Sequence, residues 1–277
     1  MKVHILSCAT MCPLGQRFVN GTGRWFARGR MVCLCLLVET PDGLALVDTG
    51  LGLDDVAGGG RLLPLPFRAL AAPRCLEEET AARQVERLGY TRADVRHIIP
   101  THLDLDHAGG LADFPRAQVH VHGPELEAAL RPRTLLERGR YLSRQWAHGP
   151  RWVTHEAGGD RWMGFESVRC VGDIALVPLS GHTRGHCGVA VPTDDDRYIL
   201  HAGDAFFHHG EMEKQPWCSP GLRLFQRVLA MDNGARLRNA RRLWALAQEE
   251  PSVDVACAHS PVQFERLRRQ RHGRATR

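Results

Sequence analysis

One short segment of the chain places four side chains that can bind metals within six residues. It reads His102-Leu103-Asp104-Leu105-Asp106-His107 and directly follows the apolar run 95–100. Imidazoles and carboxylates at this density are ligands that zinc, manganese and iron select in proteins. The alternative is a solvated turn in which Asp106 caps the next helix. That alternative explains Asp106 but not the whole group. The next residues, Ala108-Gly109-Gly110, bring the backbone close to these polar side chains and have no bulky side chain to shield them.

Three more side chains that can bind metals stand at the ends of later apolar runs. They are His182 after the run 174–179, Asp204 after 198–203 and His259 after 253–258. A lone histidine at such a place is usually a surface or core residue, but repetition of the pattern favours a common site. The residues indicate metal-dependent chemistry, and the chain has no G-x-S-x-G motif that would suggest a serine nucleophile.

The elements that must position these residues follow from the patterns of apolar residues. The runs 31–38 and 44–47 flank the turn Pro41-Asp42-Gly43 and predict a hairpin that ends at Asp48. Further strands are expected at the N-terminus and at 95–100, 118–121, 168–171, 174–179, 187–191, 197–201 and 253–257. Helices are expected at 77–88, from Pro124, at 234–248 and after Pro261, and a long surface loop at 51–75. Runs of strands with helices between them predict sheets covered by helices.

Composition fits a soluble globular protein, and no linker divides it, so we expect a single domain over residues 1–277. No apolar run approaches the roughly 20 residues that cross a bilayer. The N-terminus lacks a secretory signal, so we expect a cytoplasmic protein with no membrane contact. Nine scattered cysteines without a CxxC pair indicate neither a disulfide framework nor a zinc ribbon. Six arginines lie within 266–277, but no aromatic residues alternate with them, so no nucleic-acid partner is expected.

Taken in order, the motifs resemble the metallo-β-lactamase-like hydrolase superfamily. The series spans nearly the whole chain and consists of Asp48-Thr49-Gly50, Thr101-His-x-Asp-x-Asp-His107, Gly181-His182, Gly203-Asp204 and Ala258-His259. The resemblance implies an α/β fold, an αββα sandwich of mixed and antiparallel sheets with helices on the outer faces. It also implies two divalent metal ions at one edge of the sheets and, by analogy with relatives, a homodimer.

The resemblance assigns each metal ion a set of ligands. One ion would be held by His102, His182 and Asp204, with Asp204 bridging to the other ion. The other ion would be held by Asp106, His107 and His259.

Further roles also follow from the resemblance. Asp48 and His186 would support the ligands from outside the coordination sphere, where such groups tune metal affinity. A hydroxide shared by the two ions would be the nucleophile. Asp106 and Asp204 would be the catalytic residues, and Asp204 would pass the proton to the leaving group.

Asp104 departs from the family pattern, which has histidine at this position. Three interpretations stay open. Asp104 replaces the imidazole as a ligand, or it lies outside the coordination sphere and leaves one metal site weak, or the site binds without catalysing. As a ligand it would add a negative charge, so that Mn²⁺ or Fe²⁺ would compete with the expected Zn²⁺.

The chain looks most like the lactonase branch of the superfamily, which includes the acyl-homoserine lactonases. This likeness rests on the segments 106–110 and 181–186. The expected substrate is a small-molecule ester or lactone. The alternatives are a phosphoester or thioester hydrolase and a non-catalytic module that binds a metal or ligand.

Several apolar residues could shape the substrate site of such a lactonase. The segment 62–67 and four tryptophans either line a pocket for an acyl chain or pack the core; these are Trp146, Trp152, Trp162 and Trp217. Phe207 stands where those lactonases often carry a tyrosine, and it cannot donate a hydrogen bond. His208 and His209 are weaker candidates to face the site.

Overall fold

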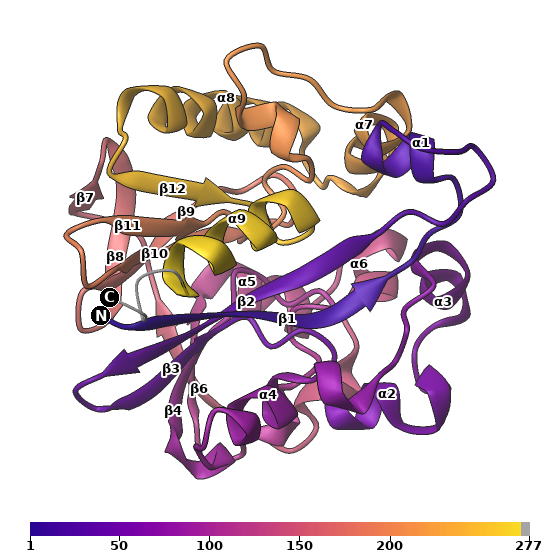
Figure 1. Cartoon of the computed structure of the whole chain (residues 1–277). Coiled ribbons are helices and arrows are strands. Elements are labelled where there is room, and N and C mark those ends of the chain that lie inside the picture. Colours follow the sequence, from indigo (N-terminus) through magenta and orange to yellow (C-terminus); the bar gives the residue numbers. More distant parts are fainter. Residues whose placement is uncertain (273–277) are drawn as a thin grey trace.

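The computed structural model describes residues 1–272, and within them two six-stranded sheets face each other (Figure 1). The first sheet has the order β1 (Val3–Met11), β2 (Met31–Thr40), β3 (Gly43–Val47), β4 (Val95–Ile99), β5 (Gln118–His122) and β6 (Arg151–His155). The second has the order β12 (Val253–Ala256), β11 (Tyr198–His201), β10 (Cys187–Pro192), β9 (Ile174–Pro178), β8 (Phe165–Val171) and β7 (Asp160–Trp162).

Both sheets mix strand directions. β1, β2 and β3 are antiparallel neighbours, whereas β3, β4, β5 and β6 run parallel to one another. In the second sheet β11 and β12 are parallel and the other pairs are antiparallel. The expected hairpin is confirmed by the pairing of Leu36 with Val47 and of Thr40 with Gly43.

The helices lie between strands of the first sheet and on both sides of β12 along the chain. Their bounds are α1 (Gln16–Asn20), α2 (Leu53–Gly60), α3 (Leu65–Ala71), α4 (Ala81–Arg87), α5 (Gly123–Leu130), α6 (Leu135–Arg140), α7 (Pro220–Leu229), α8 (Asn233–Glu249) and α9 (Pro261–His272). Local capping fixes several ends. The Thr80 side chain accepts a hydrogen bond from the Arg83 backbone at the start of α4, and Gly89 follows its end with φ of 88°.

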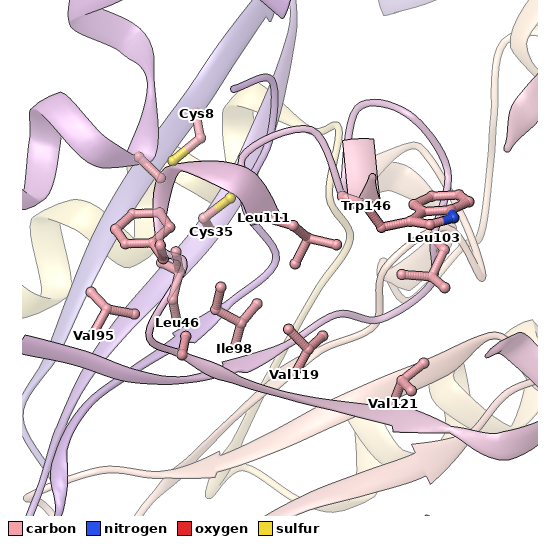
Figure 2. Packing of buried hydrophobic residues seen from close by; sticks show 14 of the residues in the cluster. Cys8, Cys35, Leu46, Val95, Ile98, Leu103, Leu111, Val119, Val121 and Trp146 are labelled. Atoms are coloured by element: carbon pink, nitrogen blue, oxygen red, sulfur yellow. The ribbon is translucent and has the colours of Figure 1, made fainter. Parts of the chain in front are cut away.

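Three buried layers hold the helices and sheets together. Between the sheets, Leu36 and Ile5 of the first pack with Leu176 and Val189 of the second. On the outer face of the first sheet, β3, β4 and β5 pack against α4, α5 and the loop after β4. Figure 2 shows part of this layer, with Val119 and Trp146 among its labelled residues. The second sheet packs against α8. This succession of layers is the expected αββα sandwich.

The expected loop at 51–75 is wrong, because α2 and α3 lie within it. The helical pattern is hard to see because α2 breaks at Gly58 and Gly59, whose backbones have positive φ. The helix α7 was not predicted either. Its apolar residues include Leu224 and Val228, which face outward rather than into the core. None of the helices within residues 1–272 has the length and apolar character that crossing a bilayer requires.

Three histidines connect β4, β5 and β6 through their side chains. His120 Nε2 lies 3.0 Å from His97 Nδ1, and His120 Nδ1 lies 3.0 Å from His155 Nε2. His97 Nε2 in turn faces Asp42 Oδ2 at 3.2 Å. Burial and then the neighbouring His97 and His155 lower the pKa of His120 to about 4. When the three histidines are neutral, all these hydrogen bonds can form if the N–H of each ring points along the row toward Asp42.

This row predicts a loss of stability in mild acid. Since the pKa of His120 is about 4 in the folded protein and near 6.5 when unfolded, the unfolded state binds the proton first as pH falls below 6.5. We expect His120 to account for about 1–2 kcal/mol of the stability lost between pH 7 and pH 5. Urea unfolding of the wild type and His120→Gln at both pH values measures this share. Equal losses in the two proteins would contradict the prediction.

Candidate metal centre

The predicted site residues all lie in loops that follow strands, and these loops meet at one edge of the sandwich. Asp48 follows β3 and residues 102–107 follow β4, its parallel neighbour. Asp204 follows β11 and His259 follows β12, again parallel neighbours. His182 lies in the loop between β9 and β10. Because the carboxyl ends of parallel strands meet at one edge, segments far apart in sequence are brought together.

The Asp204 carboxylate lies at the centre of these residues. Its Oδ2 atom is 3.4 Å from His182 Nε2 and 3.8 Å from His102 Nε2. Its Oδ1 atom is 3.1 Å from His259 Nε2 and 3.5 Å from His107 Nε2. Within each of these two sets, the potential ligand atoms lie within 4.8 Å of one another. One carboxylate therefore connects two groups that are each able to hold an ion.

Asp106 joins the second group from the side of His259. Its Oδ2 atom lies 3.8 Å from His259 Nε2 and 3.9 Å from the Cys33 sulfur. Cys33, which the sequence did not single out, forms a third set with these two residues. Burial raises the pKa of the Cys33 thiol to about 12, so it is neutral without a metal.

The free nitrogens of the imidazoles fit a metal centre. Three imidazoles are each held at Nδ1. His102 Nδ1 lies 2.9 Å from Thr101 Oγ1, and His107 Nδ1 lies 2.8 Å from Asp48 Oδ2. His259 Nδ1 lies 2.8 Å from the Val32 carbonyl oxygen. Their Nε2 atoms point at the carboxylates, and among the described residues those of His102 and His107 are buried without a hydrogen-bond partner. An imidazole held at one nitrogen with the other free is arranged as a metal ligand is.

The electrostatics of the site also favour a bound cation. Burial raises the pKa of Asp204, but His259, His107 and His182 outweigh it, so this pKa lies well below its usual value. Burial lowers the pKa of His107, yet Asp204 and Asp48 raise it to about 9. The pKa of His259 is raised well above its usual value in the same way, chiefly by Asp204. The carboxylates of the site thus attract positive charge, which metal ions would bring.

Asp104 lies against the first group and against a buried arginine. Its Oδ2 atom is 3.0 Å from His182 Nε2, 3.6 Å from His102 Nε2 and 3.4 Å from Arg140 Nη1. Arg140 comes from α6, is only 6% exposed and also donates to the carbonyl oxygens of His182 and Leu229. Burial opposes ionisation, but Arg140 and then His102 keep the pKa of Asp104 well below its usual value. The guanidinium offsets the negative charge that Asp104 brings.

Two further residues fix the loops that carry the site. The Asp204 backbone N–H donates to His186 Nε2 at 2.9 Å, and His186 Nδ1 donates to the Leu179 carbonyl at 3.1 Å, so neither nitrogen is free. The buried Glu125 carboxylate accepts from the Leu103 and Gly185 backbones and from the Thr183 hydroxyl. Glu125 thereby connects the loop after β4 with the loop that holds His182.

A cavity of about 400 Å³ adjoins the site at His259 and Phe207. It is lined by α1, by the loop after β11 and by the start of α9. His208, His209 and Trp217 line it as well, whereas Trp146 packs in the core of the first sheet and Trp162 in that of the second. The apolar segment 62–67 is not among the residues that line this cavity.

Comparison with known proteins agrees with this geometry. The family model described as the Metallo-beta-lactamase superfamily matches residues 28–250. The chain belongs to the metallo-beta-lactamase superfamily. A probable metallo-hydrolase of Mycobacterium tuberculosis is 41% identical over 273 residues, which are 97% of this chain and 83% of that protein. An N-acyl homoserine lactonase of a Bacillus species is 28% identical over 88% of each chain.

Solved structures share the fold of this metallo-hydrolase. An N-acyl homoserine lactone hydrolase with the product N-hexanoyl-L-homoserine bound at its catalytic metal center superimposes with a TM-score of 0.72. The alignment covers 96% of this chain and 95% of that chain at 23% sequence identity. Likeness at this identity establishes the architecture, while the substrate must be argued from the site.

Sequence reasoning missed Arg140, Glu125 and Cys33 in this superfamily member. Arg140 lies in a polar stretch without a motif, and its approach to Asp104 depends on how α6 packs. The only signal in the sequence was indirect. A carboxylate in place of a histidine leaves a buried charge that needs a cation, and burial without one is costly.

The support from Asp48 leads to a prediction on metal affinity. Asp48 accepts from the Thr101 backbone at 2.7 Å and the Thr101 hydroxyl at 2.9 Å, and it faces His107 Nδ1. In Asp48→Asn an amide NH₂ replaces one of the two accepting oxygens and disturbs the groups that orient Thr101 and His107. We therefore expect metal affinity to fall roughly 10–100-fold. Competition with a chromogenic chelator measures it. Asp42→Asn, on an exposed turn, is the matched control, and an equal loss there would contradict the assigned role.

The pair of Arg140 and Asp104 leads to a prediction on stability. Arg140→Met leaves a buried carboxylate without its cation, so we expect metal-free protein to lose about 3–5 kcal/mol of unfolding free energy. Added metal ions should narrow the gap to the wild type, because they provide the missing charge. Urea unfolding with and without metal tests this. The same loss in an Asp104→Asn background would show that the charge pair is not the cause.

Proposed function

We propose that this metallo-hydrolase cleaves a carboxylic ester or lactone with two divalent metal ions. The observation that carries the proposal is the central Asp204 carboxylate, which faces two pairs of imidazole nitrogens next to a cavity large enough for a small substrate. The alternative of a non-catalytic module that binds a metal or ligand fits the same cavity, and a test of turnover distinguishes the two.

The proposed ligands follow the two groups. His102, His182 and Asp204 would hold one ion, and Asp104 would join them, because its Oδ2 atom faces the same two imidazoles. Asp106, His107 and His259 would hold the other ion, and Asp204 faces both groups. Bound divalent ions supply Lewis acidity toward the substrate and activate water near neutral pH.

The protein's own residues position the reaction. Asp204 lies buried between both groups, where it would accept a proton from the attacking water and deliver it to the leaving oxygen. Asp106 lies next to His259, which lines the cavity. The backbone of Asp204 is held by His186, which limits the freedom of this carboxylate during the transfer.

A lactone or ester with an apolar substituent suits the cavity. Val19, Met31, Phe207, Trp217 and Leu222 give it apolar walls. The lactonase named among the relatives supports an acyl lactone as one candidate. Phe207 offers no hydroxyl near the site, so a substrate oxygen receives no hydrogen bond from this position. An activated ester or a lactone, whose leaving group needs little help, is favoured for this reason.

The metal preference follows from the charge of the site. Asp104 alone would favour Mn²⁺ or Fe²⁺, but Arg140 restores the positive charge that the family's histidine set retains. We therefore expect Zn²⁺ to occupy the site, and we expect Arg140→Met to shift occupancy toward Mn²⁺ or Fe²⁺. Elemental analysis of both proteins from the same medium measures the shift. Identical metal content in the two would contradict the role of Arg140.

The reaction is tested by combining metal content with a hydrolysis screen. We expect about two metal ions per chain and turnover of acyl lactones or aryl esters that exceeds turnover of thioesters and phosphoesters. Asp204→Asn should lower kcat/KM roughly 10²–10⁴-fold through lost proton transfer, and further if metal is lost. Asp113→Asn, a buried carboxylate outside the site, is the control. Two metals without any turnover would favour the binding module, and phosphoester turnover alone would reassign the substrate class.

A further inference from the structure

Three separate segments of the chain expose large apolar side chains. They are residues 14–30 around α1, residues 61–74 around α3 and residues 217–230 around α7. Phe26 is 91% exposed and Leu65 is 73% exposed. Of the seventeen large apolar side chains exposed within residues 1–272, these segments hold eleven: Leu14, Phe18, Trp25, Phe26, Leu62, Leu65, Leu70, Trp217, Leu224, Phe225 and Val228.

The same three segments carry only positive charge. They contain nine arginines and no aspartate or glutamate; the arginines are Arg17, Arg24, Arg28, Arg30, Arg61, Arg68, Arg74, Arg223 and Arg227. All nine are exposed. Arg30 and Arg74 pair with Glu265 and Glu79, and within residues 1–272 no salt bridge neutralises the other seven.

The segments adjoin one another on one side of the molecule, where Figure 1 shows α1, α3 and α7. The Ser219 hydroxyl at the start of α7 donates to the Phe18 carbonyl of α1. The Cys12 backbone, just before the first segment, donates to the Ala71 carbonyl of α3 at 2.9 Å. Leu222 of α7 belongs to a buried cluster against which Val19 of α1 and Phe67 of α3 pack. We call their outer side the apolar–basic surface.

The helix α7 shows how unusual this surface is. Its buried residues are Leu222 and Gln226, whereas Leu224, Phe225 and Val228 lie on the exposed side beside Arg223 and Arg227. A surface helix of a globular protein normally turns its apolar stripe inward. Exposed apolar patches of this kind mark sites of interaction.

The charge decides between the partners that such a surface could bind. A second copy placed symmetrically would bring arginines against arginines, which is repulsive. The phosphates of a nucleic acid would pair with the arginines, but they offer no apolar surface to exposed aliphatic side chains such as Leu65, Leu70 and Val228. An anionic lipid bilayer satisfies both features, since its headgroups attract arginine and its acyl boundary accepts leucine, phenylalanine and tryptophan.

We propose that the apolar–basic surface binds the face of a bilayer that contains anionic phospholipids. This goes beyond the proposed function and does not depend on it. It revises the expectation of no membrane contact, which rested on the absence of a spanning segment and not on surface binding. The cavity beside the metal centre is lined by Val19, Trp217 and Leu222 of the same segments, so the bound protein would hold its cavity close to the lipid.

Vesicle flotation of the full chain tests the proposal. We expect binding to vesicles of phosphatidylcholine mixed with phosphatidylglycerol and little binding to phosphatidylcholine alone, with binding weakened by salt. Each of Arg24→Gln, Arg68→Gln and Arg223→Gln should weaken partitioning roughly fivefold. Phe26→Ser and Leu65→Ser should each weaken it roughly tenfold, because each removes a side chain that would enter the lipid.

Matched controls lie away from the surface. Leu88→Ser and Arg169→Gln remove an exposed apolar and an exposed basic side chain elsewhere and should leave vesicle binding unchanged. Equal binding to neutral vesicles, no binding at low salt, or equal loss in the controls would overturn the proposal. So would a dimer in light scattering that Phe26→Ser converts to a monomer, or an RNA complex that the arginine variants abolish in place of vesicle binding.

Discussion

The structure is organised around buried charge at one edge of the sandwich. Asp204, Asp104 and Asp48 lie almost wholly out of solvent, where an isolated carboxylate would be strongly disfavoured. Each is balanced by imidazoles, by Arg140 or by backbone N–H groups that strand ends supply. The sheets must therefore hold their register closely, because a shift of one residue would remove the partners that make the burial tolerable.

Much of this arrangement could be predicted from the sequence, because it depends on local patterns. The β-rich runs predicted ten of the twelve strands, but not β6 and β7. The family resemblance predicted the sandwich and the gathering of seven candidate ligands, from His102 to His259, at one edge. Their role as ligands stays a prediction. The elements within 51–75 and the helix α7 could not be predicted in the same way. Glycine interrupts α2, and α7 exposes the apolar residues that usually indicate an inner face.

The residues that support the site, Arg140 and Glu125, could not be predicted from the sequence. Arg140 approaches Asp104 only because α6 packs against the loops that follow β4 and β9, and no motif records that contact. Glu125 is similar, since its four hydrogen bonds connect segments that only the finished fold brings together. A substitution within a motif, here Asp104 for histidine, is nevertheless a reason to search for a compensating charge elsewhere in the chain.

The division of the sheets has a consequence for how the protein folds. The first sheet uses β1 to β6 and the second uses β7 to β12, so each half of the chain builds its own sheet. The candidate ligands come from both halves, with Asp104 and His182 separated by 78 positions. Contacts between such distant segments close only after most local structure has formed. We therefore expect the candidate metal centre to form late in assembly, because its candidate ligands come from both halves of the polypeptide.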